Sequence, residues 1–416
     1  MTEISLNVSV NRMCSLAPIQ VELDFAKYLD SKEMKLFHPF HVRMVDKATG
    51  RVVPSQFSLY NEKNRFKGIL SWILLNESQK EFKVEAPVRG YSSSCRFNEG
   101  VIIWDRGDEQ LEISVNGERV TNYVFNKAYE RPFLYPVIGP DGLSVTRSVP
   151  TLGDHPHHKG IWLALGDVSG EKGKPGIDFW TLGTLDDPKH GRVIHQRFTS
   201  LEQGLVFAKI CEENVWKQND GLEGVKKGIT ILNETRITTI WNVSPMRIID
   251  IHTVMTPMVD EVILNADVEG KDTAKENGPL AIRVTDNMRG EAEGTIVNSE
   301  GGKTEKECWG RRARWVDYYG PVVKGGPVNG IAVMDHPSNV RHPPGWHVRD
   351  YGLFAVNPFY SKKPEWPDQG PIYLSKAKGE KLELRYRIYI HRGNEKEGKV
   401  EQKWQDWVNP PKINIV

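Results

Sequence analysis

Cysteine is scarce in this 416-residue sequence, and neither sign of charge prevails. The four cysteines, at positions 14, 95, 211 and 308, stand far apart, which excludes a dense disulfide framework and a CxxC-type metal site. Lysine and arginine number 55 against 54 acidic residues, so the formal net charge is +1. This balance gives no general attraction to nucleic acid or to an anionic membrane.

Long apolar runs are missing as well. No stretch approaches the roughly 20 apolar residues that a membrane-spanning helix needs. The first residues have neither the basic start nor the apolar core of a signal peptide. We therefore expect a cytoplasmic protein with reduced thiols and with no membrane or nucleic-acid partner.

Several familiar catalytic signatures are also absent. The sequence has no GxSxG elbow, no GxxxxGK[ST] phosphate loop and no dinucleotide fingerprint after a strand. Helical periodicity is sparse, and its best short example covers residues 399–407. Alternating β-formers separated by turns fill most of the chain, with 37 glycines and 25 prolines. These patterns predict an all-β fold.

The strand pattern divides the chain into two regions. Residues 1–90 show short strands, one of them expected at 40–45, and predict a small N-terminal β-sandwich that serves as an accessory domain. Residues 91–416 contain longer alternating strands and predict a large antiparallel β-sandwich of two sheets that carries the site. Asn116-Gly117 predicts a tight hairpin, because a type I′ turn needs positive φ at both central residues.

Histidines concentrate in one short segment. Three of the twelve, His155, His157 and His158, fall within four positions, directly after Asp154. Pro156 donates no backbone hydrogen bond, so the segment is expected to be an edge strand, a bulge or a loop. Grouped imidazoles mark functional sites more often than scaffolds, although single histidines in turns are commonly structural.

A second polar cluster lies in the last third of the chain. Asp335 and His336 follow an apolar strand at 331–334, where sites are commonly built on rigid scaffolds. Residues 307–320 combine three arginines with two tryptophans and, as an alternating strand, would direct Trp315 and Asp317 to one face. A solvated, ion-paired strand is the alternative for that segment.

Six short blocks carry a family resemblance. The sequence resembles the PmoA family of largely uncharacterised bacterial proteins over roughly residues 125–360, on the blocks 131–136, 154–160, 178–180, 309–311, 335–339 and 357–359. The resemblance implies a sandwich of the galactose-mutarotase type and carbohydrate chemistry. The sequence departs from the family pattern before Gly278, where Asn277 stands in place of an acidic residue and Glu276 lies one position earlier.

These observations lead to a first functional hypothesis, a carbohydrate-active enzyme of the glycoside hydrolase, lyase or sugar epimerase type. An imidazole can donate or accept a proton near neutral pH. We expect His157 or His158 to do so, with Asp335 and His336 as the opposing group. The two segments should then line one concave cleft of a β-sheet.

The expected partner is a small saccharide. Its recognition needs aromatic faces for the sugar C–H groups and planar polar groups for the hydroxyls. The candidate substrate-binding residues are Arg147, Trp162, Trp180, Arg283, Trp315, Asn339 and Trp346.

Two alternatives remain open from the sequence. His155 and His157 could chelate a divalent metal, zinc or a similar ion, because imidazole suits these metals. The protein could instead bind a saccharide without catalysis. The many aromatic residues also lead us to expect self-association into a homo-oligomer.

Overall fold

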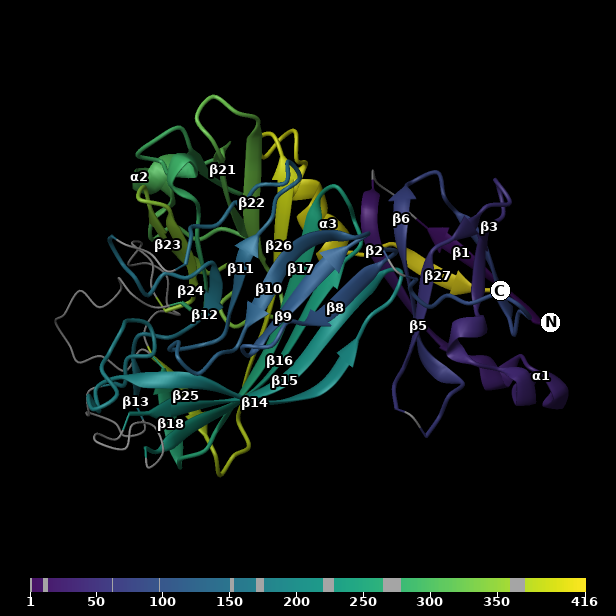
Figure 1. Cartoon of the computed structure of the whole chain (residues 1–416), viewed down its shortest axis with the longest axis horizontal. Helices are drawn as coiled ribbons and strands as arrows, with labels where there is room; N and C mark the ends of the chain where they lie inside the picture. Colours follow the sequence, from purple (N-terminus) through teal and green to yellow (C-terminus); the bar gives the residue numbers. More distant parts are fainter. Residues whose placement is uncertain are drawn as a thin grey trace.

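Two eight-stranded antiparallel sheets face each other in the larger part of this protein (Figure 1). The computed structural model describes residues 2–9, 14–61, 63–96, 98–149, 153–169, 176–219, 228–264, 278–359 and 371–416. Strands dominate these residues and the helices are short. The predicted all-β fold, a small N-terminal sandwich followed by a large two-sheet antiparallel sandwich, is confirmed.

The first large sheet has the strand order β23-β24-β19-β12-β11-β10-β9-β8. Its strands are β8 (Val101–Asp105), β9 (Gln110–Val115), β10 (Glu118–Val124), β11 (Phe133–Val137), β12 (Ile161–Leu163), β19 (Leu280–Arg283), β23 (Gly345–Arg349) and β24 (Leu353–Asn357). Residues that are far apart in the sequence therefore share one surface.

The second large sheet has the order β14-β15-β16-β17-β26-β22-β21-β20. Its strands are β14 (Gly191–Glu202), β15 (Phe207–Gln218), β16 (Thr230–Trp241), β17 (Arg247–Pro257), β20 (Thr295–Asn298), β21 (Trp315–Pro321), β22 (Val328–Asp335) and β26 (Leu382–Arg392). A three-stranded sheet adjoins the sandwich and contains β13 (Val168–Ser169), β18 (Glu261–Leu264) and β25 (Ile372–Ser375).

One apolar core fills the space between the two large sheets. Alternation along each strand builds it, since successive side chains point to opposite faces. On β12, Ile161 and Leu163 join this core while Trp162 lies on the outer face. On β17, Ile249 and Ile251 point inward from the facing sheet. Burying each such aliphatic side chain stabilises the fold by about 1.5–3 kcal/mol.

A second core lies within the N-terminal unit, which consists of β1–β7 and β27. Two sheets enclose it, ordered β27-β1-β7-β3-β4 and β2-β6-β5. The strands are β1 (Thr2–Ser9), β2 (Ser15–Asp24), β3 (Arg43–Asp46), β4 (Val52–Val53), β5 (Ser55–Leu59), β6 (Lys67–Asn76), β7 (Glu81–Ala86) and β27 (Lys412–Ile415). Because β27 pairs with β1, the end of the chain returns to this unit (Figure 1). The division after residue 90 stays a prediction.

Hydrogen bonds join the N-terminal unit to the large sandwich. Gln56 Nε2 donates to Glu202 Oε1 at 2.8 Å, and Gln56 Oε1 accepts from the backbone N–H groups of Val206 and Phe207 at 3.3 and 3.2 Å. The ammonium group of Lys403, on α3 (Val400–Val408), donates to the carbonyl of Ser15. Polar groups buried by docking are thus paired across the junction.

Helices contribute little to this fold. Besides α3, the described residues contain α1 (Ser31–Leu36), α2 (Thr304–Cys308) and the 3-10 helices η1 (Phe25–Lys27), η2 (Pro39–His41) and η4 (Asp286–Met288). None of the helices in the described part of the chain combines the length and the apolar character that a membrane crossing requires.

Local predictions had mixed outcomes. The hairpin is confirmed, with φ of 50° at Asn116 and 82° at Gly117 between β9 and β10, and the helix predicted at 399–407 corresponds to α3. The strand predicted at 40–45 is wrong at its start, because Pro39 begins η2 and a strand forms only from Arg43. The strand predicted over 307–320 is wrong before Trp315, where α2 and irregular backbone precede β21.

Candidate functional site

The outer face of the first large sheet carries the residues of the candidate site. Cross-strand pairing aligns one row of outward side chains: Phe133 lies opposite Trp162, Trp162 opposite Ala281, Ala281 opposite Ala355, and Ala355 opposite His347. Alternation explains the row, since the neighbours of these residues on the same strands enter the sandwich core. The small side chains of Ala281 and Ala355, between Trp162 and His347, leave room on this face for side chains of a covering segment.

The segment Asp154–His158, the histidine loop, covers this face. It is a turn rather than a strand, and His155 adopts a left-handed φ of 48°, which is uncommon for a residue with a side chain. The buried guanidinium of Arg147 donates to the carbonyl oxygens of Asp154 at 2.9 Å and of His155 at 2.7 Å. A second buried guanidinium, that of Arg283 on β19, donates from Nη2 to Asp154 Oδ2 at 2.9 Å. Both arginines were predicted to bind substrate, and here they hold the loop.

The carboxylate of Asp154 stays ionised in this setting. Burial alone would raise its pKa, but hydrogen bonds from His155 and Arg283 and the charge of Arg147 outweigh burial and lower the pKa to about 2. Nδ1 of His155 lies 2.7 Å from Oδ2 of Asp154. Because 47% of the Asp154 side chain is exposed, a fixed negative charge faces solvent at the tip of the loop.

Aromatic rings and imidazoles stack beneath that carboxylate. Ring centroids lie 4.8 Å apart for Tyr351 and His155, 4.7 Å for His155 and His158, and 5.3 Å for His158 and Trp162, all near parallel. The ring of His157 meets that of His158 edge-on at 4.4 Å. Nη1 of Arg283 lies 3.3 Å from Nδ1 of His158. Since a guanidinium only donates, this Nδ1 is the acceptor and a neutral His158 carries its proton on Nε2.

The imidazoles of His157, His158 and His347 are neutral at physiological pH. Burial, followed by the positive charge of Arg131, lowers the pKa of His157 to about 3. Burial also lowers the pKa of His158 well below its ordinary value. On the neighbouring strand β23, burial and the charge of Arg349 lower the pKa of His347 to about 3. Neutral imidazoles donate and accept hydrogen bonds at once, so they suit uncharged hydroxyl groups.

Supporting residues that the sequence did not single out complete the site. Arg131 donates to the carbonyl oxygens of His157 at 3.1 Å and of Trp180 at 2.6 Å, and so ties the histidine loop to the segment that carries Trp180. The buried ion pair of Lys159 and Glu130, 2.8 Å from Nζ to Oε2, lies beside it. The position of Arg131 within the 131–136 block was the only sequence signal.

Two predicted binding residues have a structural role. Trp162 and Trp180 are 1% and 2% exposed, so neither offers a face to a ligand, and they form the floor under His158. The prediction of open tryptophan platforms here is wrong, because the loop covers both rings. Among the rings that the structure describes at this site, those of His155, His157 and Tyr351 are partly exposed.

The second predicted cluster is built around a buried carboxylate. Asp335, at the end of β22, accepts from Nδ1 of His342 at 2.6 Å and from Nδ2 of Asn339 at 2.7 Å. His336 points elsewhere, with its Nδ1 2.7 Å from the hydroxyl of Ser338. The sequence therefore identified the carboxylate but missed its histidine, which lies seven residues downstream rather than next to it.

The described contacts do not connect the two clusters. The histidine loop lies on the first large sheet, whereas Asp335 belongs to the second, and no hydrogen bond, ion pair or ring contact between described residues joins them. Trp346 points into the sandwich core and donates to the carbonyl of Ala313, and Trp315 packs against α3 and donates to Glu401 at 2.7 Å. These contacts therefore give no support to the prediction that both clusters line one concave cleft. Glu276 and Asn277 lie outside the described residues.

The metal prediction also lacks support. Among the described residues, no group of three or more His, Cys, Asp or Glu side chains is arranged to hold a metal ion. His155 and His157, the predicted ligands, have ring centroids 5.7 Å apart in a T-shaped arrangement, and Nδ1 of His155 is directed to Asp154. A site built on these two histidines stays a prediction without support from this geometry.

Comparisons with known proteins come from solved structures and from a family model. A protein in glycosyl hydrolase family 38 from Enterococcus faecalis matches with 10% identity and a TM-score of 0.44, over 100% of this chain and 47% of its own. An α-mannosidase from Enterococcus faecalis V583 matches with 10% identity and a TM-score of 0.43, over 100% of this chain and 46% of its own. A GH36 α-galactosidase from Geobacillus stearothermophilus matches with 11% identity and a TM-score of 0.30, over 71% and 40%. The chain spans less than half the length of these proteins, and matches this weak carry no functional argument.

The family model decides the classification. No curated protein matches the sequence. The resemblance to the PmoA family is wrong, because the family whose model matches, over residues 110–405, is a different one. That match covers well over half of the chain and includes both polar clusters. The chain belongs to the family of unknown function DUF6807.

Proposed function

We propose that this protein is a carbohydrate-active enzyme and that the histidine loop is its site. The observation that carries the proposal is the close grouping of an ionised carboxylate, Asp154, with neutral imidazoles on a loop that buried guanidinium groups hold in place. Preorganised groups of this kind contribute to catalysis because they need no rearrangement when charge develops in the substrate.

Exposure indicates which groups would meet a saccharide. The side chains of Asp154 and His155 are 47% and 39% exposed, and the ring of Tyr351 stacks on His155 at their side. A carboxylate and an imidazole can pair with sugar hydroxyls, and an aromatic ring can pack against sugar C–H groups. These are the requirements for holding one sugar unit at the surface of the loop.

The chemistry would divide between the two kinds of group. Asp154, ionised at all physiological pH values, would accept a proton or stabilise positive charge that develops on the sugar. His157, neutral and without a hydrogen bond to its ring among the described residues, would serve as the second proton-transfer group. Hydrolysis, elimination and epimerisation all use such a pair, so the proposal covers these three reactions.

A second candidate, a saccharide-binding protein without catalysis, is favoured by one observation. A pKa of about 3 makes the ring of His157 a weak base at neutral pH. General acid–base catalysis is most efficient when the pKa of the group is near the operating pH. Neutral imidazoles that only form hydrogen bonds with hydroxyl groups need no pKa near the operating pH.

A panel of oligosaccharides and oxidised sugars, incubated with the full chain with and without a chelator, tests both candidates. The enzyme proposal expects a new product by NMR spectroscopy, which also distinguishes epimers of equal mass, and a loss of turnover of about 10²- to 10⁴-fold in His157→Ala, with affinity changed far less. His252→Ala, which removes a surface histidine paired with Glu383 on the second large sheet, is the matched control. Binding without product across the panel would support the second candidate, and absence of both binding and product would contradict both.

A further inference from the structure

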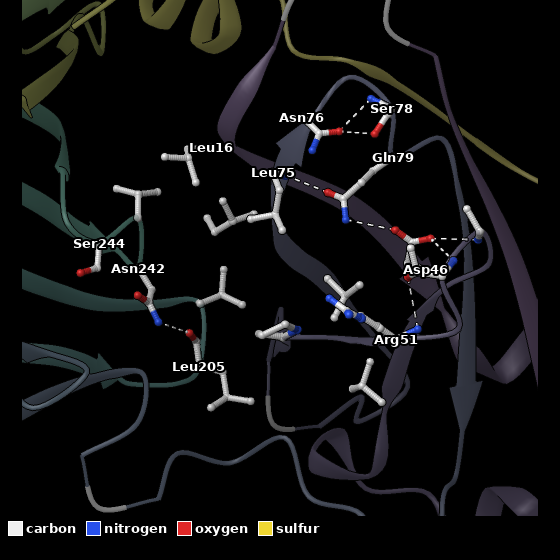
Figure 2. A pocket seen from close by; sticks show the side chains of 18 of the residues that line it. Leu16, Asp46, Arg51, Leu75, Asn76, Ser78, Gln79, Leu205, Asn242 and Ser244 are labelled. Carbon is white, nitrogen blue, oxygen red and sulfur yellow. Dashed lines mark hydrogen bonds between the residues drawn. The ribbon is translucent and has the colours of Figure 1, made fainter.

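A pocket of about 440 Å³ lies between the N-terminal unit and the large sandwich (Figure 2). Small-molecule sites generally measure about 300–1,000 Å³ and prefer domain interfaces. One wall comes from the turn after β3 and from the end of β6, and the other from residues 205–206 and 242–244 of the sandwich. The pocket is therefore large enough for a small ligand and exists only when the two units are docked.

The walls of this pocket are mainly aliphatic. Val52 and Leu75 line it from the N-terminal unit, and Leu205 and Val243 line it from the sandwich. Val52 and Leu75 remain 50% and 52% exposed, so apolar surface faces solvent on this side. Among the described residues, no aromatic side chain lines the pocket, so these residues offer no stacking surface of the kind that a sugar ring prefers. A ligand with an aliphatic body fits this lining better than a saccharide does.

Most polar groups of the pocket already have partners. Asp46 accepts from the backbone N–H groups of Ala48 and Thr49 at 2.9 and 3.1 Å, and its Oδ2 accepts from Gln79 at 3.1 Å. The side-chain amides of Asn116 and Asn242 donate to each other at 3.0 and 3.1 Å. These groups are poor candidates for holding a ligand, because each would first have to give up a hydrogen bond.

The guanidinium of Arg51 differs from these groups. It makes no hydrogen bond or ion pair with any residue that the structure describes, and Figure 2 shows its side chain directed into the pocket from the same turn as Asp46. Asp46 accepts from Ala48, Thr49 and Gln79, and the exposed Arg51 forms no ion pair with a carboxylate of the described residues. A carboxylate matches the fork of a guanidinium and would complete this side of the pocket.

We propose that this interdomain pocket binds a small aliphatic carboxylate. The carboxylate pairs with Arg51, and the hydrocarbon body lies between Val52 and Leu75 on one side and Leu205 and Val243 on the other. Such a ligand contacts both units, so its binding favours their docked arrangement by mass action. The proposal concerns a site apart from the histidine loop and does not depend on the function proposed for that loop.

Titration calorimetry on the full chain with octanoate tests the proposal, with octylammonium and 1-octanol as probes of equal chain length. We expect saturable binding of octanoate, weaker binding of octanol and none of octylammonium. Octanoate should also raise the unfolding temperature of the chain. Absence of saturable octanoate binding, or equal binding of all three probes, would overturn the proposal.

Variants separate the two parts of the site. Arg51→Gln should weaken octanoate binding by about tenfold or more while leaving octanol unchanged, because only the charged contact is lost. Arg89→Gln, at an exposed position of the same unit outside the pocket, is its control. Leu75→Glu should abolish octanoate binding, whereas Leu36→Glu, at a similarly exposed leucine of α1, should not. Unchanged affinity in both Arg51→Gln and Leu75→Glu would refute the assignment.

Discussion

Replacing Arg236 with methionine should destabilise the large sandwich by about 3–5 kcal/mol, because a buried carboxylate loses its cation. Arg236, on β16, is 2% exposed and donates twice to Glu234, from Nε at 2.7 Å and from Nη2 at 2.9 Å. A second buried carboxylate, Glu212, lies 3.8 Å from its Nη1. The hydroxyl of Thr253 and the indole N–H of Trp216 also donate to Glu234, at 2.8 and 2.9 Å.

The loss of stability in Arg236→Met should depend on pH, and the contacts around Glu234 determine the direction of this dependence. Burial alone would raise the pKa of Glu234, but the charge and hydrogen bonds of Arg236 outweigh burial and lower it. In the wild type, Glu234 thus contributes stability that is present above its unfolded pKa of about 4.3 and is lost as pH falls through the folded value. In the variant, burial raises the pKa, so the carboxyl takes up a proton in mild acid and part of the cost disappears. The difference between the two proteins should therefore shrink as pH falls.

A matched control exists on the same sheet. Arg197 forms the same two-point pair with Glu213, at 2.8 and 2.9 Å, but these side chains are 67% and 42% exposed. Exposed pairs typically contribute about 0.2–1 kcal/mol, so Arg197→Met should shift the unfolding transition little. Urea unfolding followed by tryptophan fluorescence at several pH values compares the variants. Equal shifts for both substitutions, or a loss in Arg236→Met that does not vary with pH, would refute the reasoning.

Two further predictions concern the polar clusters. Because burial and then the charge of Arg131 lower the pKa of His157 to about 3, its ring should stay neutral between about pH 7 and 5. Because the pKa of His157 is lower in the folded than in the unfolded state, its neutral ring contributes stability above about pH 6.5. This contribution is lost as pH falls. An NMR titration of the ring protons with a midpoint near the ordinary value would contradict this. Asp335→Ala should cost about 1–3 kcal/mol, because the partly buried donor of His342 and the buried donor of Asn339 lose their acceptor. Denaturant midpoints measure this cost, and an unchanged midpoint would show that solvent replaces the carboxylate.

Local patterns in the sequence predicted most of the fold. Alternation over residues 247–259 anticipates β17, since every second side chain must enter the core, and Asn116-Gly117 fixes a turn through two backbone conformations. The strand expected at 40–45 failed because Pro39 favours a tight turn at its start. Pairing between distant strands has no such local signal. The end of the chain returns as β27 to pair with β1, and no pattern near either strand indicates it.

The site was predicted to a lesser extent, for the same reason. The density of histidines at 155–158 is visible in the sequence, but the partners of the loop come from β19, from the turn between β23 and β24, and from the segment before β11. Which residues of those strands face the loop depends on register, and a shift of one position would reverse every side chain. Tyr351 lies in the turn between β23 and β24 and Arg131 lies just before β11, outside any strand pattern, and both were missed. Asp335 was identified, whereas its partner His342 was not, because the intervening turn decides which histidine reaches the carboxylate.

Burial separates the residues that hold the site from those that can meet a ligand. Arg147, Arg283 and Trp162 are inaccessible, so replacing any of them alters the loop itself and would lower binding and turnover together. Asp154 and His155 are partly exposed at the tip of the loop. Replacing the ring of His155 leaves the guanidinium contacts in place, whereas replacing Asp154 also removes the carboxylate that accepts from Arg283. The functional question is thus best asked at His155, since a loss there without a loss of stability reports on contact with the substrate. A similar loss at Arg283 would report only that the support had failed.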